Sequence, residues 1–255
     1  MLKDYIQIQE IRPKLVALLW RAFQIWFYWL TFLVSLVVNN VVCRYKIIGQ
    51  SPPATGPVLI TMNHMSMWDL AVMFTPTHRP FHFVTKRELF DVKFVGGLLW
   101  ILGCFPIKQG QADRQALQTA RSFLKKGQMV GICPEGHRSR DHQLHKASNG
   151  VALLAVNAPA DTWIVPIAVW GTEYIWQKRR GRFLSHRPPV TVHIGQPYHL
   201  SQLPASNATK GKHGNLEEIT EQIMLKIAEL MPEQYQGAYK LSEIAHRHHE
   251  QVVNQ

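Results

Sequence analysis

From Val42 to Tyr239 the sequence alternates short apolar runs with amphipathic stretches. Short apolar runs bounded by turn residues are typical of buried strands, and amphipathic stretches are typical of helices. We expect strands at Tyr45–Ile48, Val58–Met62, Phe81–Val84, Met129–Ile132, Trp163–Val169 and Val190–Ile194. We expect helices at Met67–Phe74, Phe94–Leu102, Arg114–Lys125, Lys146–Asn157 and Leu216–Met231. Strands interleaved with helices predict an α/β fold with a mixed, mostly buried sheet flanked by helices. Residues 45–239 form one predicted domain.

An uncharged segment lies between Arg21 and Arg44, and Ala22–Val38 is almost wholly apolar or aromatic. A bilayer core of roughly 30 Å needs about 20 helical residues to cross, so this segment is at the lower limit of a span. Basic residues flank both sides, which favours a helix or helical hairpin that dips into one leaflet over a spanning helix. A buried core helix is a third alternative. A cleaved signal peptide is not favoured, because the segment starts late and no small-residue cleavage site follows. We predict that residues 1–44 form a membrane-associating helical segment.

The formal net charge of +11 implies an anionic partner, which can be a nucleic acid, an anionic membrane face or a phosphate-bearing substrate. No nucleic-acid-binding motif is present, and the aromatic residues concentrate in the apolar N-terminal segment rather than among basic patches. We therefore expect membrane lipids as partners and no nucleic acid. The widely spaced Cys43, Cys104 and Cys133 argue against a disulfide framework or a zinc finger. They suit a reducing compartment and predict a site on the cytoplasmic face of the membrane.

His64 and Asp69 stand at the junction of a predicted strand and a predicted helix. On one continuous helix, five steps of about 100° would turn them roughly 140° apart. They meet only if His64 precedes the helix and Asp69 lies in its first turn. Ser66 is a good N-cap, and Asp69 three residues later completes a near-capping box. The geometry therefore predicts an imidazole at the mouth of a site, oriented by a carboxylate.

A His–Asp pair without a nearby catalytic Ser or Cys suggests general-base catalysis, in which the acceptor's own hydroxyl is the nucleophile. The alternative is that Ser66 and Asp69 only cap a helix, with His64 as an incidental loop residue. The short motif by itself leaves both open.

A second group of polar residues, Pro134-Glu135-Gly136-His137-Arg138-Ser139, follows the apolar run Met129–Ile132. Gly136 permits close approach of the backbone to a ligand, and the planar guanidinium of Arg138 matches phosphate oxygens. Glu135 would hold that arginine or a substrate hydroxyl. In isolation, a charged surface turn with a local ion pair is the alternative.

Taken together, Asn-His-x-Ser-x-x-Asp and Pro-Glu-Gly-x-Arg-Ser resemble motifs of the glycerolipid acyltransferases, in the 1-acylglycerol-3-phosphate (lysophosphatidate) acyltransferase branch. Further stretches that are similar to this family follow in the family's order. The family's second block is similar to Lys86-Arg87-Glu88-Leu89 and Gly103-Cys104-Phe105-Pro106-Ile107, and its third block to Pro134–Ser139. Its fourth block is similar to Val165-Pro166-Ile167, and a common ending in its bacterial branch to Leu230-Met231-Pro232 with Tyr235-x-Gly237-x-Tyr239. The resemblance covers residues 45–239, which it identifies as a catalytic domain.

The resemblance implies that His64 deprotonates the acceptor hydroxyl, which then attacks the thioester of acyl-CoA or acyl-carrier protein, and that Asp69 supports His64. It implies a lysophosphatidate-like acceptor, bound by the third block with Arg138 at its phosphate. No metal and no organic cofactor is expected, because the thioester supplies its own leaving group. The candidate substrate-binding residues are Glu135, Gly136, Arg138, Ser139, Lys108 and Lys86.

The sequence departs from the family pattern at three positions. Gln109 stands where the second block often has an arginine, with Lys108 beside it, and lysine gives a point charge rather than a bidentate fork. His137 replaces the usual threonine, and Cys133 replaces the usual phenylalanine. The departure at Gln109 leaves other acceptors open, such as another lysophospholipid, a glycolipid or an amino-acid lipid. Non-enzymatic alternatives are an inactive membrane scaffold and a basic nucleic-acid binder.

Three polar segments complete the expectations. Ser201–Gly214 is predicted to be a loop. Lys178–Arg182 is compatible with either a lipid head-group contact or a solvated loop. Residues 240–255 form a polar, His-rich tail that lacks a defined metal-ligand geometry.

Overall fold

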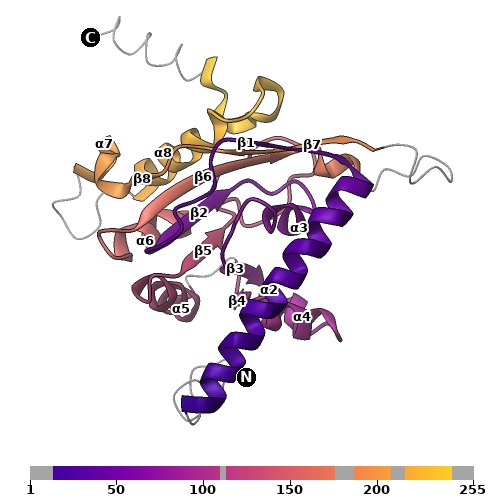
Figure 1. The fold of residues 1–255 in the computed structure, drawn as a ribbon. Coiled ribbons are helices and arrows are strands. Elements are labelled where there is room, and N and C mark those ends of the chain that lie inside the picture. The colour runs from indigo at the N-terminus through magenta and orange to yellow at the C-terminus, as the bar shows by residue number, and fades with distance from the viewer. Residues whose placement is uncertain (1–13, 110–112, 176–186, 208–215, 243–255) are drawn as a thin grey trace, which may run out of the picture.

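The computed structural model describes residues 14–109, 113–175, 187–207 and 216–242, and eight strands in this part of the chain form one sheet (Figure 1). The strands are β1 (Arg44–Ile48), β2 (Val58–Met62), β3 (Phe81–Lys86), β4 (Phe105–Ile107), β5 (Met129–Ile132), β6 (Trp163–Trp170), β7 (Pro189–Ile194) and β8 (Tyr198–His199). Their order is β1-β7-β6-β2-β5-β3-β4, with β8 paired to β6. Strands β2 to β6 are parallel to one another, whereas β7 and β8 pair with β6 in antiparallel orientation. The sheet is therefore mixed, as predicted.

Helices cover both faces of this sheet. The α-helices are α2 (Lys14–Val42), α3 (Asp69–Met73), α4 (Val95–Ile101), α5 (Arg114–Lys125), α6 (Gly150–Asn157), α7 (Pro204–Asn207) and α8 (Leu216–Ala228). Short 3₁₀ helices are η1 (Arg87–Phe90), η2 (Thr172–Tyr174), η3 (Leu200–Gln202), η4 (Glu233–Tyr235) and η5 (Gly237–Tyr239). The predicted α/β class, with flanking helices and an apolar helix at the N-terminal end, is confirmed.

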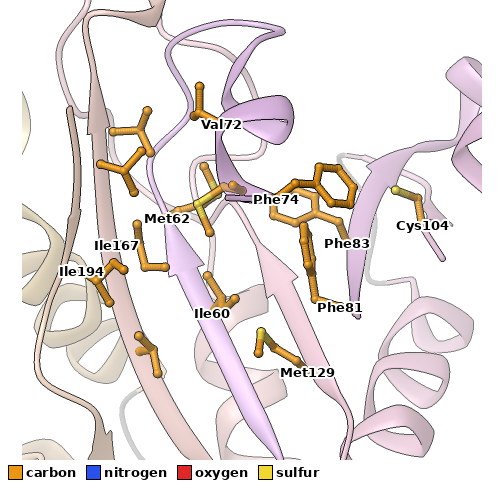
Figure 2. Packing of buried hydrophobic residues seen from close by; sticks show 14 of the residues in the cluster. Ile60, Met62, Val72, Phe74, Phe81, Phe83, Cys104, Met129, Ile167 and Ile194 are labelled. Atoms are coloured by element: carbon orange, nitrogen blue, oxygen red, sulfur yellow. The ribbon is translucent and has the colours of Figure 1, made fainter. Parts of the chain in front are cut away.

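Strand β2 shows why the sheet is buried on both faces. All five of its residues are buried, and the pleat sends alternate side chains to opposite sides. Ile60 and Met62 pack on one side with Val72, Phe74 and their neighbours (Figure 2). Side chains of α2, α3 and α4 belong to that cluster, whereas α5, α6 and α8 pack on the opposite side, where Leu59 points.

Several element bounds differ from the prediction at their ends. Strands β2 and β5 and helix α5 have the predicted bounds, and Gly127 (φ +69°) ends α5 as the expected C-terminal glycine. Strands β4 and β8 were not predicted, because three and two residues are too short to show a periodic pattern. The helix predicted from Lys146 begins at Gly150, and the helix predicted to Met231 ends at Ala228.

The prediction of a loop at Ser201–Gly214 was wrong at Pro204–Asn207, which form the short helix α7. Pro204 takes the first helical position, where its missing N–H costs nothing. The backbone amide of Ala205 donates to Gln222 Oε1 of α8 (3.1 Å). This tertiary contact stabilises a helical turn in a segment whose polar composition predicts a loop. Residues 208–215, the basic stretch Lys178–Arg182 and most of the predicted tail lie outside the described residues.

Helix α2 is the long apolar element at the N-terminal end. Its stretch Leu18–Val42 is long and apolar enough to cross a membrane, and 17% of its most apolar window is buried. That exposure is unlike the burial of a core helix and is compatible with membrane association. One side of α2 is held to the fold: Asn39 donates to Ala71 O (3.4 Å) and Thr75 Oγ1 (3.3 Å), and Tyr28 donates to Thr77 O.

Candidate active site

The two predicted motifs meet at the carboxyl edge of the parallel strands. Strand β2 lies between β5 and β6, so the loops that leave these three strands lie side by side. The His64 loop leaves β2, the Glu135 loop leaves β5, and η2 leaves β6. This edge is where open α/β sheets bind their ligands.

The His64–Asp69 contact has the geometry predicted from helix periodicity. His64 Nδ1 lies 2.7 Å from Asp69 Oδ2, and α3 begins at Asp69, so the imidazole stands outside the helix. Because an ionised carboxylate only accepts, Nδ1 carries a proton, which leaves Nε2 as the acceptor nitrogen of the neutral ring. The His64 side chain is 27% exposed and that of Asp69 is 2% exposed. The acceptor nitrogen therefore belongs to a partly solvent-accessible ring held by a buried carboxylate.

The turn between them is closed by Asp69 as well as by Ser66. Asp69 Oδ2 also accepts hydrogen bonds from Met65 N (2.7 Å) and Ser66 N (2.8 Å). Ser66 Oγ accepts from Trp68 N (3.0 Å), but the residue at the N-cap of α3 is Trp68, which makes no side-chain cap. The prediction that Ser66 caps a helix starting at Met67 was therefore wrong, because α3 begins at Asp69. The Asp69 carboxylate and the Ser66 hydroxyl instead hold residues 65–68 in a separate turn before the helix. The Asp69 carboxylate therefore both closes the turn before α3 and orients the imidazole.

Thr172 is part of this site and was missed in the sequence. Its hydroxyl donates to Asp69 Oδ1 at 2.6 Å, and both residues are buried. Thr172 follows Gly171, whose φ of +92° lets the chain turn sharply out of β6. A Cβ at Gly171 would lie 2.0 Å from the carbonyl oxygen of Pro189, so glycine is required there.

Asn63 fixes the start of the His64 loop. Its amide donates to Val169 O and its carbonyl oxygen accepts from Val169 N, each at 2.7 Å, and the side chain is fully buried. Through these two hydrogen bonds to Val169 of β6, the Asn63 side chain continues the pairing of β2 with β6 by one residue beyond Met62. The direction in which His64 leaves β2 is thereby set.

Glu135 joins the two motifs through backbone groups. Its Oε1 accepts from His64 N (3.2 Å) and its Oε2 accepts from His145 N (2.9 Å). The amide of Ser139 donates to the carbonyl of His64 (2.8 Å), which makes a second link. Burial raises the pKa of Glu135 to about 7, against the lowering effect of these amides. The carboxylate thus accepts from two backbone amides between the loops, and among the described residues it makes no hydrogen bond or ion pair with Arg138.

The rest of the third block divides into exposed and buried residues. Arg138 is exposed, and its guanidinium makes no hydrogen bond or ion pair with any described residue. Gly136 is exposed, with φ +73°. Ser139 is buried and donates to Asp141 Oδ1 (2.9 Å) while accepting from Gln143 N (2.9 Å), so its hydroxyl closes the loop.

The two candidate lysines lie at the same edge of the sheet. Lys86 ends β3, and its Nζ is 4.0 Å from Glu88 Oε2. Lys108 follows β4, is exposed, and donates from its backbone N to Asp113 Oδ2 (2.9 Å). Beside it, Gln109 Nε2 donates to the carbonyl oxygen of Gly136. This last contact ties the β4 exit to the turn that carries Arg138.

A second His–Asp pair lies on the loop after Ser139. His145 Nε2 is 2.8 Å from Asp141 Oδ1, and the His137 ring packs against His145 with centroids 5.3 Å apart. No pattern in the sequence indicated it, because Asp141 and His145 lie in a loop without regular periodicity. Among the described residues, no group of three or more His, Cys, Asp or Glu side chains is placed to hold a metal ion.

The arrangement can take up a proton at an oriented imidazole, at the same edge of the sheet as the exposed Arg138. In such a step Asp69 would stabilise the imidazolium, and the hydrogen bonds that Asp69 accepts hold its carboxylate in place. Arg138, Lys108 and Lys86 make the same edge cationic, which suits an anionic substrate.

Comparisons with known proteins identify the family of the chain. Residues 44–170 match the model of the family described as Acyltransferase. The chain is similar to the 1-acyl-sn-glycerol-3-phosphate acyltransferase of Pseudomonas aeruginosa, with 34% identity over 74% of this chain and 68% of that protein. The relative from Bacillus subtilis with the same name is 28% identical over 70% of this chain and 83% of its own length.

Two other comparisons bear on extent and fold. The chloroplastic 1-acyl-sn-glycerol-3-phosphate acyltransferase of Arabidopsis thaliana is 29% identical, and the match spans 42% of its length. The crystal structure of the 1-acyl-sn-glycerophosphate acyltransferase of Thermotoga maritima has the same fold, with a TM-score of 0.54 at 17% identity, over 82% of this chain and 91% of that one. By its sequence, this chain belongs to the acyltransferase family, in the branch of the 1-acyl-sn-glycerol-3-phosphate acyltransferases.

Proposed function

We propose that the chain transfers a fatty acyl group from the thioester of acyl-CoA or acyl-carrier protein to the free hydroxyl of 1-acylglycerol-3-phosphate, which gives phosphatidic acid. The observation that carries the proposal is the partly exposed imidazole of His64, held through Nδ1 by the buried Asp69. The names of the relatives support the acceptor.

The reaction needs one proton carrier. His64 Nε2 takes the proton of the acceptor hydroxyl while that oxygen attacks the thioester carbonyl carbon. The tetrahedral intermediate collapses, the C–S bond breaks, and the imidazolium returns the proton to the leaving thiolate. General-base catalysis of this kind contributes about 10²–10⁴ in rate.

The acceptor's phosphate is assigned to Arg138. Its guanidinium is exposed at the turn that begins at Gly136, and planar donors match phosphate oxygens. Lys108 and Lys86 add positive charge at the neighbouring strand ends. Glu135 and Ser139 act on the acceptor through the shape of the loop, since their polar groups bond within the protein.

A second acceptor class is favoured by Gln109. Its amide is engaged with the Gly136 carbonyl, so this position brings no guanidinium to the phosphate. Another lysophospholipid, a glycolipid or an amino-acid lipid is therefore the alternative acceptor. An inactive scaffold or a nucleic-acid binder would show no thioester turnover with any of them.

We also propose that the site works at the cytoplasmic face of a membrane, with α2 embedded in one leaflet rather than crossing it. The free thiols of Cys43, Cys104 and Cys133 support a reducing compartment. The hydrogen bonds that hold α2 to α3 support a helix lying against the catalytic domain.

The test is thiol release from acyl-CoA and acyl-carrier protein by purified protein in mixed vesicles, with a panel of lysolipid acceptors. His64→Ala should lose at least about a hundredfold in kcat. The matched control is His78→Ala, an exposed histidine at the opposite edge of the sheet, which should keep wild-type activity. No acyl transfer by wild type would reject the enzyme, and full activity of His64→Ala would reject the mechanism.

A further inference from the structure

A second group of exposed apolar side chains lies outside helix α2. Val92, Phe94, Val95 and Leu98 are 48%, 83%, 39% and 48% exposed, at the tip and outer side of α4. Phe94 is the most exposed large apolar side chain of the described residues. Such a cluster on a folded surface marks a contact with an apolar partner.

The backbone holds Phe94 outward at a cost. Its φ of +68° lies in the left-handed region, which a bulky residue avoids unless the surroundings impose it. Gly96 helps to impose it. A Cβ there would lie 2.1 Å from the carbonyl oxygen of Phe90, so the first turn of α4 is pressed on η1. We call this closely packed tip, Val92–Leu98, the wedge.

The chemistry around the wedge is that of a lipid–water interface. The ammonium of Lys93 lies 5.4 Å from the centroid of the Phe94 ring. Lys86 at the end of β3 is exposed, as are Arg87 and Glu88 of the adjoining η1 and Asp91, which precedes the tip. An exposed aromatic ring beside an ammonium, with a further exposed lysine and arginine on the adjoining segment, suits the head-group region of an anionic bilayer.

Helix α4 and helix α2 belong to the same layer of the fold. Tyr28 of α2, Phe74 after α3 and Leu99 of α4 pack in one cluster on one face of the sheet. On the opposite layer, Val156 is the exposed large apolar residue among those described in α5, α6 and α8. The α2 and α4 helices lie on one side of the sheet in Figure 1. The exposed apolar side chains of α4 thus lie in the same layer of the fold as α2, the helix proposed to enter the membrane.

We propose that the α4 tip, Val92–Leu98, is a second membrane contact that inserts Phe94 into the interface of an anionic bilayer. A single helix leaves a domain free to rotate about it, whereas two contacts on one layer fix the domain's tilt. Because β3 ends at Lys86 and runs directly into η1, this contact also sets the height of the carboxyl edge, where His64 lies, above the lipid.

The test places a nitroxide label at three positions of the full chain in vesicles. Phe94→Cys reports the wedge, Leu33→Cys reports α2 (57% exposed), and Val156→Cys is the matched apolar control on the opposite layer (44% exposed). Depth is read from collisions with oxygen, which enriches in lipid, against a water-soluble nickel chelate. Wild type gives the background labelling of its three cysteines.

With phosphatidylcholine–phosphatidylglycerol vesicles, labels at 94 and 33 should be reached by oxygen and shielded from nickel, while label 156 stays in water. Removing phosphatidylglycerol should return label 94 toward water and leave label 33 in lipid. Phe94→Ser should lower the vesicle partition coefficient at least about tenfold, and Val156→Ser should not. Label 94 in water in both vesicles overturns the proposal. Shielding of label 94 from both reagents also overturns it, because protein rather than lipid would then cover the tip.

Discussion

The hydroxyl of Thr172 donates to Asp69 Oδ1 at 2.6 Å, which completes the set of donors around that carboxylate. The other oxygen accepts from His64 Nδ1, Met65 N and Ser66 N. Asp69, at the start of α3, thereby links the loop that follows β2 to Thr172, which lies 103 positions later in the chain after β6. A buried carboxylate held on both oxygens cannot rotate away from the imidazole, so its orientation of His64 depends on Thr172.

Thr172→Val should lower kcat/KM by about 10- to 100-fold, because losing a hydrogen bond to a buried charged group costs about 1.5–3 kcal/mol. Valine keeps the shape but leaves Asp69 Oδ1 without a donor. Thr172→Ser keeps the hydroxyl and should restore most of the activity. Acyl transfer and urea unfolding are measured on both variants. Equal activity of the valine and serine variants, at equal stability, would show that the bond does not position Asp69.

Asp69→Asn separates the charge of the carboxylate from its geometry. The amide oxygen can keep the three donors at Oδ2, and the amide nitrogen can donate to Thr172, whose hydroxyl also accepts. The free energy of unfolding should therefore change by less than about 1 kcal/mol. The imidazolium loses its counter-charge, so kcat should fall by about 10² or more. A variant that unfolds readily would instead assign Asp69 chiefly to holding the turn.

The sequence predicted those parts of the site that depend on local geometry. Helix periodicity required His64 to precede the helix that Asp69 begins, and the structure has that relation. Thr172 could not be found in this way, because its contact depends on β6 lying beside β2, and pairing across the sheet leaves no short-range pattern. Glu135 was recognised as part of a motif, but the direction in which its carboxylate points depends on the hydrogen bond from His145 N, ten residues later in the loop. The strands β4 and β8 were missed because their few residues form by pairing with neighbours.

The buried carboxyl of Glu135 predicts a pH dependence of stability. Its native pKa of about 7 lies above the ordinary value of 4.5, so between these values the native state binds more protons than the unfolded state. Stability from this group is therefore full below pH 4.5 and is lost as pH rises through 7, by about 2–3 kcal/mol. Urea unfolding in detergent at pH 5 and pH 8 measures the difference.

Glu135→Gln removes the titration and should flatten that pH dependence. The exposed Glu217→Gln on α8 is the control for removing any carboxylate, and its pH dependence should match wild type. A Glu135→Gln variant that still loses stability between pH 5 and pH 8 as wild type does would place the effect on another group.

Gln109→Arg tests how the acceptor is chosen. Gln109 donates to the Gly136 carbonyl at the turn that carries the exposed Arg138, so an arginine here would bring a second guanidinium to the same place. Charge-assisted bonds to phosphate should lower KM for 1-acylglycerol-3-phosphate by about tenfold relative to lysolipids without a terminal phosphate. Gln109→Met is the matched control, since it removes the amide contact and adds no charge. If methionine shifts the preference as arginine does, the contact with Gly136, rather than charge at position 109, sets acceptor choice.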